Sequence, residues 1–299
     1  MDSSIPASVA DPVPGAVPGA DAGVLAGAVP TRRVWRQLWR RKTAVFGLLL
    51  AAGVLAGAAL APVLAPADPL AMSPRRLALP STVAWFGTDQ FGRDLLSRLL
   101  FGARVSMSVS FCAVALASFI GGTMGLVAGF FEGTLDPVLM RAVDILMAFP
   151  TLLLALAVVA TFGASLGNLV LAITLAYVPI FSRIVRGRVL SVKQHDFIAA
   201  SRALGAGDTR LMLREILPNV LAPVIVQATL NLSTAIMIEV ALSFLGLGVQ
   251  PPAASWGSML SEARGFMELD PWLAIAPGIA ITPAVLGFNL FGDGLRDVL

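Results

Sequence analysis

The stretch 105-VSMSVSFCAVALASFIGGTMGLVAGFF-131 runs for 27 residues without a charged side chain. A helix that crosses a hydrocarbon core of roughly 30 Å needs about 20 apolar residues, because each residue adds about 1.5 Å. Residues 105–131 are therefore long enough to cross a membrane once.

Three other nearly uncharged runs predict further spans. Residues 43–67 and 272–292 are each long enough for one crossing. Residues 216–250 predict another, which is interrupted only by Glu239.

The fifth run, residues 145–182, has 38 uncharged residues and would be about 57 Å long as one helix. That length exceeds one crossing. Gly163, Gly167 and Asn168 lie near its middle, where a turn would divide it into two spans. We therefore predict an all-α, polytopic membrane protein with six transmembrane helices.

The composition supports a membrane protein and excludes several other classes. The 299 residues are 57% hydrophobic and 13% charged, whereas soluble domains have about 25% charged residues. Such totals do not fit a soluble globule, a disordered chain or a nucleic-acid-binding protein. The one cysteine, Cys112, can form no intrachain disulfide and cannot build a metal site alone.

The basic residues predict the orientation and the segments of the chain. If both termini are cytoplasmic, 15 of the 21 Lys and Arg residues lie inside, as membrane insertion favours. Residues 1–30 are rich in Ala, Pro and Gly and predict a disordered tail rather than a signal peptide. We expect residues 31–103 to hold the first span and an outer loop, and residues 104–299 a core of five helices.

Several catalytic motifs are absent from the sequence. The two lysines, Lys42 and Lys193, do not follow a glycine, so the chain has no P-loop for ATP hydrolysis. The single histidine, His195, lies in a predicted inner loop and is interpreted as a surface residue. We therefore expect no enzyme activity in this chain.

Two acidic residues lie at or near membrane depth. Asp144 follows Arg141 by three residues, which predicts an ion pair on one helix face. Glu239 has two interpretations, because a charge inside the bilayer needs a partner or a cavity. It is either a structural contact near the outer end of its span or a proton or substrate contact.

An elbow is predicted on the cytoplasmic side, in 191-SVKQHDFIAASRALGAGDTRLMLREILPN-219. The apolar spacing of its first part predicts a short amphipathic helix that ends at Gly205 and Gly207. Asp208 would cap a second helix that begins at Thr209. The pattern fits either a docking element for a soluble partner or a helix that lies on lipid headgroups.

This elbow resembles the EAA loop of permease subunits in bacterial binding-protein-dependent ABC importers. Ala199 stands where the family usually has glutamate, and Ser201 replaces an alanine. The resemblance assigns contact with an ATPase subunit to one group of residues. They are Phe197, Ala199, Ala200, Ser201, Leu204, Gly205, Ala206, Gly207, Ile216, Leu217, Pro218 and Asn219.

Other motifs resemble the C-type subunit of the dipeptide, oligopeptide and nickel permeases. The segment 86-FGTDQFGRDLLSR-98 matches the FGTDxxGRDxxSR signature, and 242-LSFLGLGVQPP-252, 255-SWG-257 and 288-FNLFGDGLRD-297 are similarly typical. The family residues in these motifs and at the acidic span position are Gly87, Thr88, Asp89, Gly92, Arg93, Asp94, Glu239, Gly246 and Gly248. The resemblance covers about residues 32–299.

The resemblance implies a type I ABC importer permease fold in a bacterial inner membrane. It also implies a B-type permease subunit, two cytoplasmic ATPase subunits that bind ATP and Mg, and an extracytoplasmic solute-binding protein. No cofactor in this chain is implied, and peptides are the expected cargo. The alternative from another class is a proton-coupled secondary transporter that uses Glu239.

Overall fold

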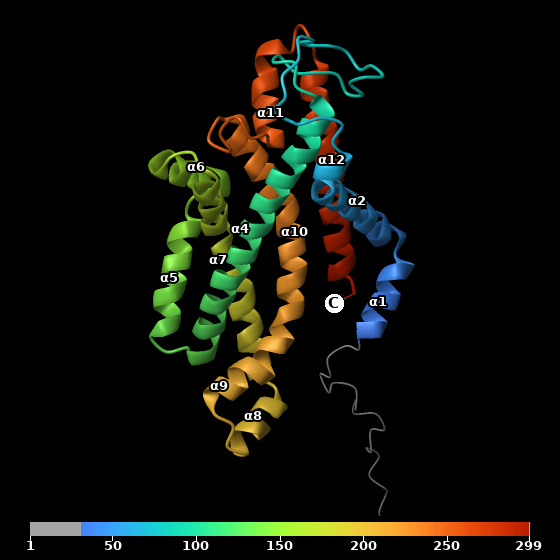
Figure 1. Cartoon of the computed structure of the whole chain (residues 1–299). Helices are drawn as coiled ribbons and strands as arrows, with labels where there is room; N and C mark the ends of the chain where they lie inside the picture. The colour runs from blue at the N-terminus through green and yellow to red at the C-terminus, as the bar shows by residue number, and fades with distance from the viewer. Residues whose placement is uncertain (1–30, 299) are drawn as a thin grey trace, which may run out of the picture.

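The computed structural model describes residues 31–298, which are helices joined by loops (Figure 1). The predicted tail, residues 1–30, lies outside this part of the chain. The helices are α1 (Thr31–Arg40), α2 (Lys42–Ala59), α3 (Ala61–Leu64), α4 (Leu95–Phe131), α5 (Leu135–Met147), α6 (Thr151–Phe162), α7 (Leu166–Lys193), α8 (Asp196–Ala203), α9 (Asp208–Arg210), the π-helix η1 (Leu211–Ile216), α10 (Leu217–Phe244), α11 (Trp256–Ala263), the 3-10 helix η2 (Arg264–Phe266) and α12 (Trp272–Arg296).

Within residues 31–298, five helices are long and apolar enough to cross a membrane. They are α2, α4, α7, α12 and the helix Asp208–Phe244, which combines α9, η1 and α10. The pair α5 and α6 would supply a sixth span if the two helices count as one. The all-helical, multi-span prediction is confirmed.

The first two predicted spans differ from the structure at their ends. Residues 43–67 form α2 and the short α3, and the helix ends at Leu64, shortly before Pro66. The helix predicted over 105–131 begins at Leu95, where Asp94 is its N-cap residue. Arg98, in the first turn, is paired with Asp89 and Glu262, so its charge does not end the helix. The expected division between residues 103 and 104 falls inside α4.

The long run 145–182 is divided by a turn at Gly163, as predicted, but it also contains a bend that was not predicted. Helices α5 and α6 meet at 88° across the residues from Ala148 to Pro150. Pro150 has no backbone N–H and disfavours a helical conformation at Phe149, so the helix breaks there. Helix α5 also begins at Leu135, ten residues before the predicted run.

Helices α4 and α7 share the largest helix–helix interface in the described part of the chain. Gly121, Gly125 and Gly129 of α4 face the backbone of α7. A Cβ atom on Gly121 would lie 2.4 Å from the carbonyl oxygen of Val178, and one on Gly125 would lie 2.3 Å from that of Ser182. The small residues therefore allow the two helices to approach closely, as in other membrane helix pairs.

Helix α10 packs against α4, α7 and α12, while α2 lies on α12 at the edge of the bundle. Figure 1 shows α8 and α9 at one end of the molecule, which we call the elbow end. Helix α11 and the loop 65–94 lie at the opposite end, which we call the loop end. Candidate functional residues occur at both ends.

Candidate functional site

The elbow is anchored in a small apolar core of its own. Ile198 of α8 and Leu211 and Ile216 of η1 are buried. They pack with side chains from the ends of α4 and α7, including Phe130 and Val189. This second core holds the elbow to the helix bundle.

The tip of the elbow is exposed. Leu204 follows α8 and has 89% of its surface exposed. Gly205 has a φ of +84°, a conformation that L-residues with a side chain rarely adopt. A Cβ atom at Gly205 or Gly207 would have no neighbour within 4 Å. The tip therefore presents an apolar side chain on a fixed turn with open space around it.

The second half of the elbow is a wide helical turn. The N–H group of Leu217 donates to the carbonyl oxygen of Met212, five residues earlier. Pro218 has no N–H group to continue the usual hydrogen-bond pattern, and the Asn219 side chain instead donates to the Glu215 carbonyl at 2.7 Å. The predicted cap is wrong: the helix begins at Asp208, with Gly207 as its N-cap residue and no side-chain capping bond.

The predicted contact residues all lie on this elbow, but they differ in exposure. Buried or half-buried positions anchor the elbow, whereas exposed positions are available to a partner. The anchoring set is Phe197, Ser201, Ala206, Ile216, Leu217 and Asn219. The exposed set is Ala199, Ala200, Leu204, Gly205, Gly207 and Pro218.

At the loop end, the predicted signature folds into a compact turn before α4. Asp89 accepts hydrogen bonds from the backbone N–H groups of Phe91 and Arg93 at 2.8 and 2.9 Å. Thr88 pairs with Asp94 in an isolated β-bridge, and Gly87 and Gly92 both have positive φ. Asp94 then caps α4 by accepting from the Ser97 N–H at 2.8 Å.

A buried ion cluster joins this turn to α11. Arg93 Nη2 lies 2.8 Å from Glu262 Oε2, and Arg98 Nη2 lies 3.0 Å from Glu262 Oε1. Asp89 Oδ2 lies 2.5 Å from Arg93 Nε and 3.4 Å from Arg98 Nη1. We call these four residues the ion cluster. Because it pairs two cations with two anions, it has no net formal charge.

Glu262 is a member that sequence reasoning missed. The sequence indicated it only indirectly, through an excess of positive charge in the motif. Because Asp94 caps α4, Asp89 is the one carboxylate of the motif that can balance Arg93 and Arg98. Only the folded chain brings a carboxylate from more than 160 positions away to the two arginines.

Glu239 is completely buried at the loop-end side of α10. Its Oε1 accepts a hydrogen bond from Ser243 at 2.7 Å, and the side chains of Ser106 of α4 and Ser255 lie beside its carboxyl group. The structural interpretation of Glu239 is therefore supported. Gly246 has a positive φ and ends α10, and Gly248 packs closely against Ser243.

Ion pairs also connect α5 with α7, and one differs from the prediction. Asp144 pairs with Arg183 of α7 at 2.6 Å rather than with Arg141. Asp136 accepts two hydrogen bonds of 2.6 Å from Arg186. The facing helix supplies arginines that sequence spacing within α5 could not reveal.

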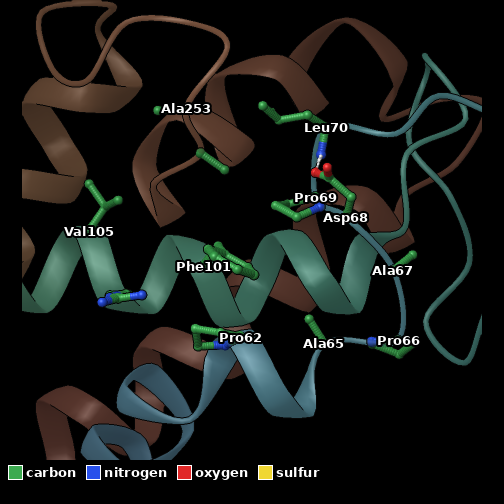
Figure 2. A pocket seen from close by; sticks show the side chains of 12 residues that line it. Pro62, Ala65, Pro66, Ala67, Asp68, Pro69, Leu70, Phe101, Val105 and Ala253 are labelled. Atoms are coloured by element: carbon green, nitrogen blue, oxygen red, sulfur yellow. Dashed lines mark hydrogen bonds between the residues drawn. The ribbon is translucent and has the colours of Figure 1, made fainter.

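A cavity of about 760 Å³ lies at the loop end, between the end of α3, the start of α4 and the residues before α11. Figure 2 shows Pro62, Phe101 and Ala253 around it, together with Asp68, which accepts a hydrogen bond from the Leu70 N–H. Its wall is mainly apolar, with the exposed Arg104 as its basic residue.

The described residues contain no group of three His, Cys, Asp or Glu side chains that could hold a metal ion. His195 is exposed, and its ring stacks on Phe197 with 5.8 Å between the ring centroids. The interpretation of His195 as a surface residue is consistent with this position.

Comparison with protein families gives two matches that together cover most of the chain. Residues 121–299 match the family "Binding-protein-dependent transport system inner membrane component". Residues 30–80 match "N-terminal TM domain of oligopeptide transport permease C".

Individual relatives are similar over most of their length. The dipeptide transport system permease protein DppC of Alkalihalophilus pseudofirmus is 47% identical over 86% of this chain and 85% of its own. The di/tripeptide permease DppC of Pseudomonas aeruginosa is 44% identical over 86% and 88%. The glutathione permease GsiD of Pectobacterium atrosepticum is 45% identical over 74% and 73%.

Among solved structures, the inward-facing MetNI methionine ABC transporter is similar in fold. The match has a TM-score of 0.56 at 18% identity and covers 68% of this chain and 96% of the other. The predicted importer permease fold is therefore confirmed at the level of architecture.

Proposed function

This chain belongs to the family of binding-protein-dependent transport system inner membrane components, and we propose that it forms half of the pathway for short peptides. It is a multi-pass inner-membrane subunit of an ABC importer, in which separate ATPase subunits bind and hydrolyse ATP. Relatives named for dipeptides, for di- and tripeptides and for glutathione support a cargo of two or three residues.

The exposed elbow is the observation that carries the mechanism. A leucine with 89% of its surface exposed, on a tip anchored by a separate apolar core, offers an apolar contact to a partner surface. We assign this contact to one ATPase subunit, in a cleft that closes when ATP binds. Movement of the elbow would then pass into α7 and α10, which precede and follow the elbow in the chain.

The remaining partners follow from this assignment. A B-type permease subunit would complete the pathway, and the binding protein would dock on the loop end, over residues 67–104 and 248–271. The elbow end would then face the cytoplasm, together with both termini. The excess of Lys and Arg in the predicted inner segments supports this orientation.

We retain two segments of the described chain in this assignment. Residues 31–103 hold the first span and the outer loop, and the permease core with its elbow at 191–219 follows from residue 104. The ion cluster links the two segments, because Arg93 and Arg98 lie before the boundary at residues 103 and 104 and Glu262 lies after it.

Proton-coupled transport through Glu239 is not favoured. A proton carrier needs access to water from each side in turn, whereas Glu239 is completely buried among serines of this chain. We expect a Glu239→Gln importer to retain ATP-dependent uptake. If an uncoupler that collapses the proton gradient abolished uptake while the ATP concentration stayed constant, the proton-coupled alternative would be favoured.

The experiment that tests the elbow uses Gly205→Val in the full importer, coexpressed with its partner subunits and reconstituted in proteoliposomes. We expect normal membrane insertion, but a loss of tripeptide uptake and of ATPase stimulation by the loaded binding protein of about tenfold or more. Such a loss corresponds to roughly 1.4 kcal/mol of coupling free energy.

Gly163→Val is the matched control, because Gly163 also has a positive φ and open space but lies at the turn between α6 and α7. It imposes backbone strain away from the elbow. Equal loss in both variants, or normal uptake by Gly205→Val, would contradict the assignment.

A further inference from the structure

Polar side chains line one face of α10 at the middle of its length. Gln227, Asn231 and Thr234 follow i, i+4, i+7 spacing. Asn231 lies 14 residues after Leu217 and 13 before Phe244, about 20 Å from each end of the helix. These residues therefore lie near the middle of the membrane, where lipid offers no hydrogen-bond partner.

The three residues are joined by hydrogen bonds and contact α7. Gln227 Nε2 donates to Asn231 Oδ1 at 2.8 Å. Tyr177 of α7 donates to Thr234 Oγ1 at 2.8 Å, and Thr234 Oγ1 donates to the Asn231 carbonyl oxygen at 3.1 Å. Thr234 is thus held in place by α7 and by the backbone of α10.

The carboxamide pair Gln227–Asn231 is not satisfied by these contacts. Asn231 is only 5% exposed, and its Nδ2 has no hydrogen-bond partner. In the described part of the chain, no donor lies within hydrogen-bonding distance of Gln227 Oε1. The one hydrogen bond between the two carboxamides leaves the NH2 group of Asn231 and the carbonyl oxygen of Gln227 unused.

Two neighbouring polar side chains of α10, Ser233 and Thr229, differ because they are paired inside the chain. Ser233 donates to Asn289 of α12 at 2.7 Å. Thr229 donates to the Ile225 carbonyl oxygen at 2.9 Å. A polar group left unpaired in a membrane is costly, so the free capacity of the Gln227–Asn231 pair points to a polar ligand.

The pair borders a side of α10 that the described residues leave uncovered. Thr234 and Met237 are exposed, Gln227 is half-buried, and Asn231 lies immediately behind this edge next to α7. To reach this edge, the Asn231 carboxamide would turn and exchange its hydrogen bond from Gln227 for one with the ligand. A ligand at this face, in the middle of the membrane, would therefore find one acceptor, Gln227 Oε1, and one donor group, Asn231 Nδ2.

We propose that the Gln227–Asn231 pair binds the main chain of a peptide in transit, with Thr234 and Tyr177 positioning it. This inference rests on the proposed peptide transport. In an extended peptide, the N–H and C=O groups of one residue point to the same side, as in a β-ladder. The pair would accept from that N–H and donate to that C=O, so it would bind peptides regardless of their side chains.

The test compares uptake of trialanine with uptake of trialanine N-methylated at its second residue, which lacks one N–H donor. The full importer is reconstituted with Gln227→Met or Asn231→Leu, and both peptides are supplied at saturating binding protein. We expect Gln227→Met, which removes the acceptor for that N–H group, to lower trialanine uptake about fivefold, the value of one hydrogen bond, and uptake of the methylated peptide less than twofold. Asn231→Leu removes the donor to the peptide C=O group, which both peptides keep, so it should lower both rates about fivefold. Thr229→Val is the control at the same depth of α10, and it should leave both rates unchanged.

A crosslinking measurement tests proximity independently of rate. A benzophenone side chain at the exposed Met237, one helical turn after Thr234, should capture radiolabelled trialanine during ATP-driven turnover. The same group at the exposed Leu286 of α12 serves as the control and should capture much less.

Equal losses for the two peptides in Gln227→Met would indicate a structural role and overturn the inference. Unchanged uptake in both variants, or no preferential capture at Met237, would also overturn it. If the unmodified importer moves neither peptide, the proposed function fails and this inference fails with it.

Discussion

At the loop end of the bundle, Arg98 is 1% exposed and pairs with two carboxylates, whereas at the elbow end Leu204 is 89% exposed and has open space around it. The loop end thus buries charge, and the elbow exposes an apolar side chain. Each is the reverse of the usual distribution for a protein in water. The ion cluster pairs its charges within the chain, whereas we have proposed that the elbow tip binds an ATPase subunit. Substitutions at the two ends should therefore affect stability and coupling separately.

The largest expected effect on stability is that of Arg98→Ala. Removal of one partner from a buried ion pair leaves Asp89 and Glu262 without full compensation, at a cost of about 3 to 5 kcal/mol. We expect less folded protein in the membrane and a lower midpoint of thermal unfolding in detergent, measured by fluorescence-detected size exclusion.

Arg76→Ala is the matched control for that substitution, because Arg76 lies exposed in the loop that leads to α4. It should leave the unfolding midpoint unchanged. A similar decrease in both variants would show that the ion cluster has no special contribution.

A smaller and more local effect is expected from Leu211→Ala. Leu211 is fully buried in the second core, and truncation of a buried leucine costs about 2 to 5 kcal/mol. Because this core is small, we expect the elbow to open while the spans remain folded. Hydrogen exchange should increase over residues 196–216 and stay unchanged in α11; faster exchange throughout the chain would contradict a separate elbow.

The smallest effect on stability is expected from Leu204→Ser. The side chain has no buried surface to lose, so the unfolding free energy should change by less than about 0.5 kcal/mol. ATPase stimulation by the loaded binding protein should nevertheless fall severalfold, because the partner contact is lost. Retained stimulation would remove Leu204 from the ATPase contact, and Leu213→Ser tests a second exposed leucine of the elbow.

The sequence predicted those features that depend on local pattern. Uncharged runs located the spans, and glycine spacing located the elbow and the turn at Gly163. The signature residues around Asp89 were also identified, although their structural role was not.

Features that depend on tertiary pairing could not be predicted in the same way. Glu262 and Arg183 are separated by long stretches of chain from the residues they bind, and no local spacing relates them. The bend between α5 and α6 occurs at Pro150. A proline alone does not predict such a bend, because α7 continues through Pro179. The free hydrogen-bonding groups of Gln227 and Asn231 could not be predicted either, because they depend on which side chains of neighbouring helices pair with them.

The glycine interface between α4 and α7 determines how far a displacement can travel. Close backbone packing couples the two helices, so we expect them to move together. Helix α4 alone has 37 residues and is about 55 Å long. A tilt of roughly 5° about its midpoint moves each end by roughly 2 Å, without any bending between them. Since α7 leads directly into the elbow and α4 begins at Asp94, a small rotation imposed on one side of the membrane reaches the other side as a displacement of similar size.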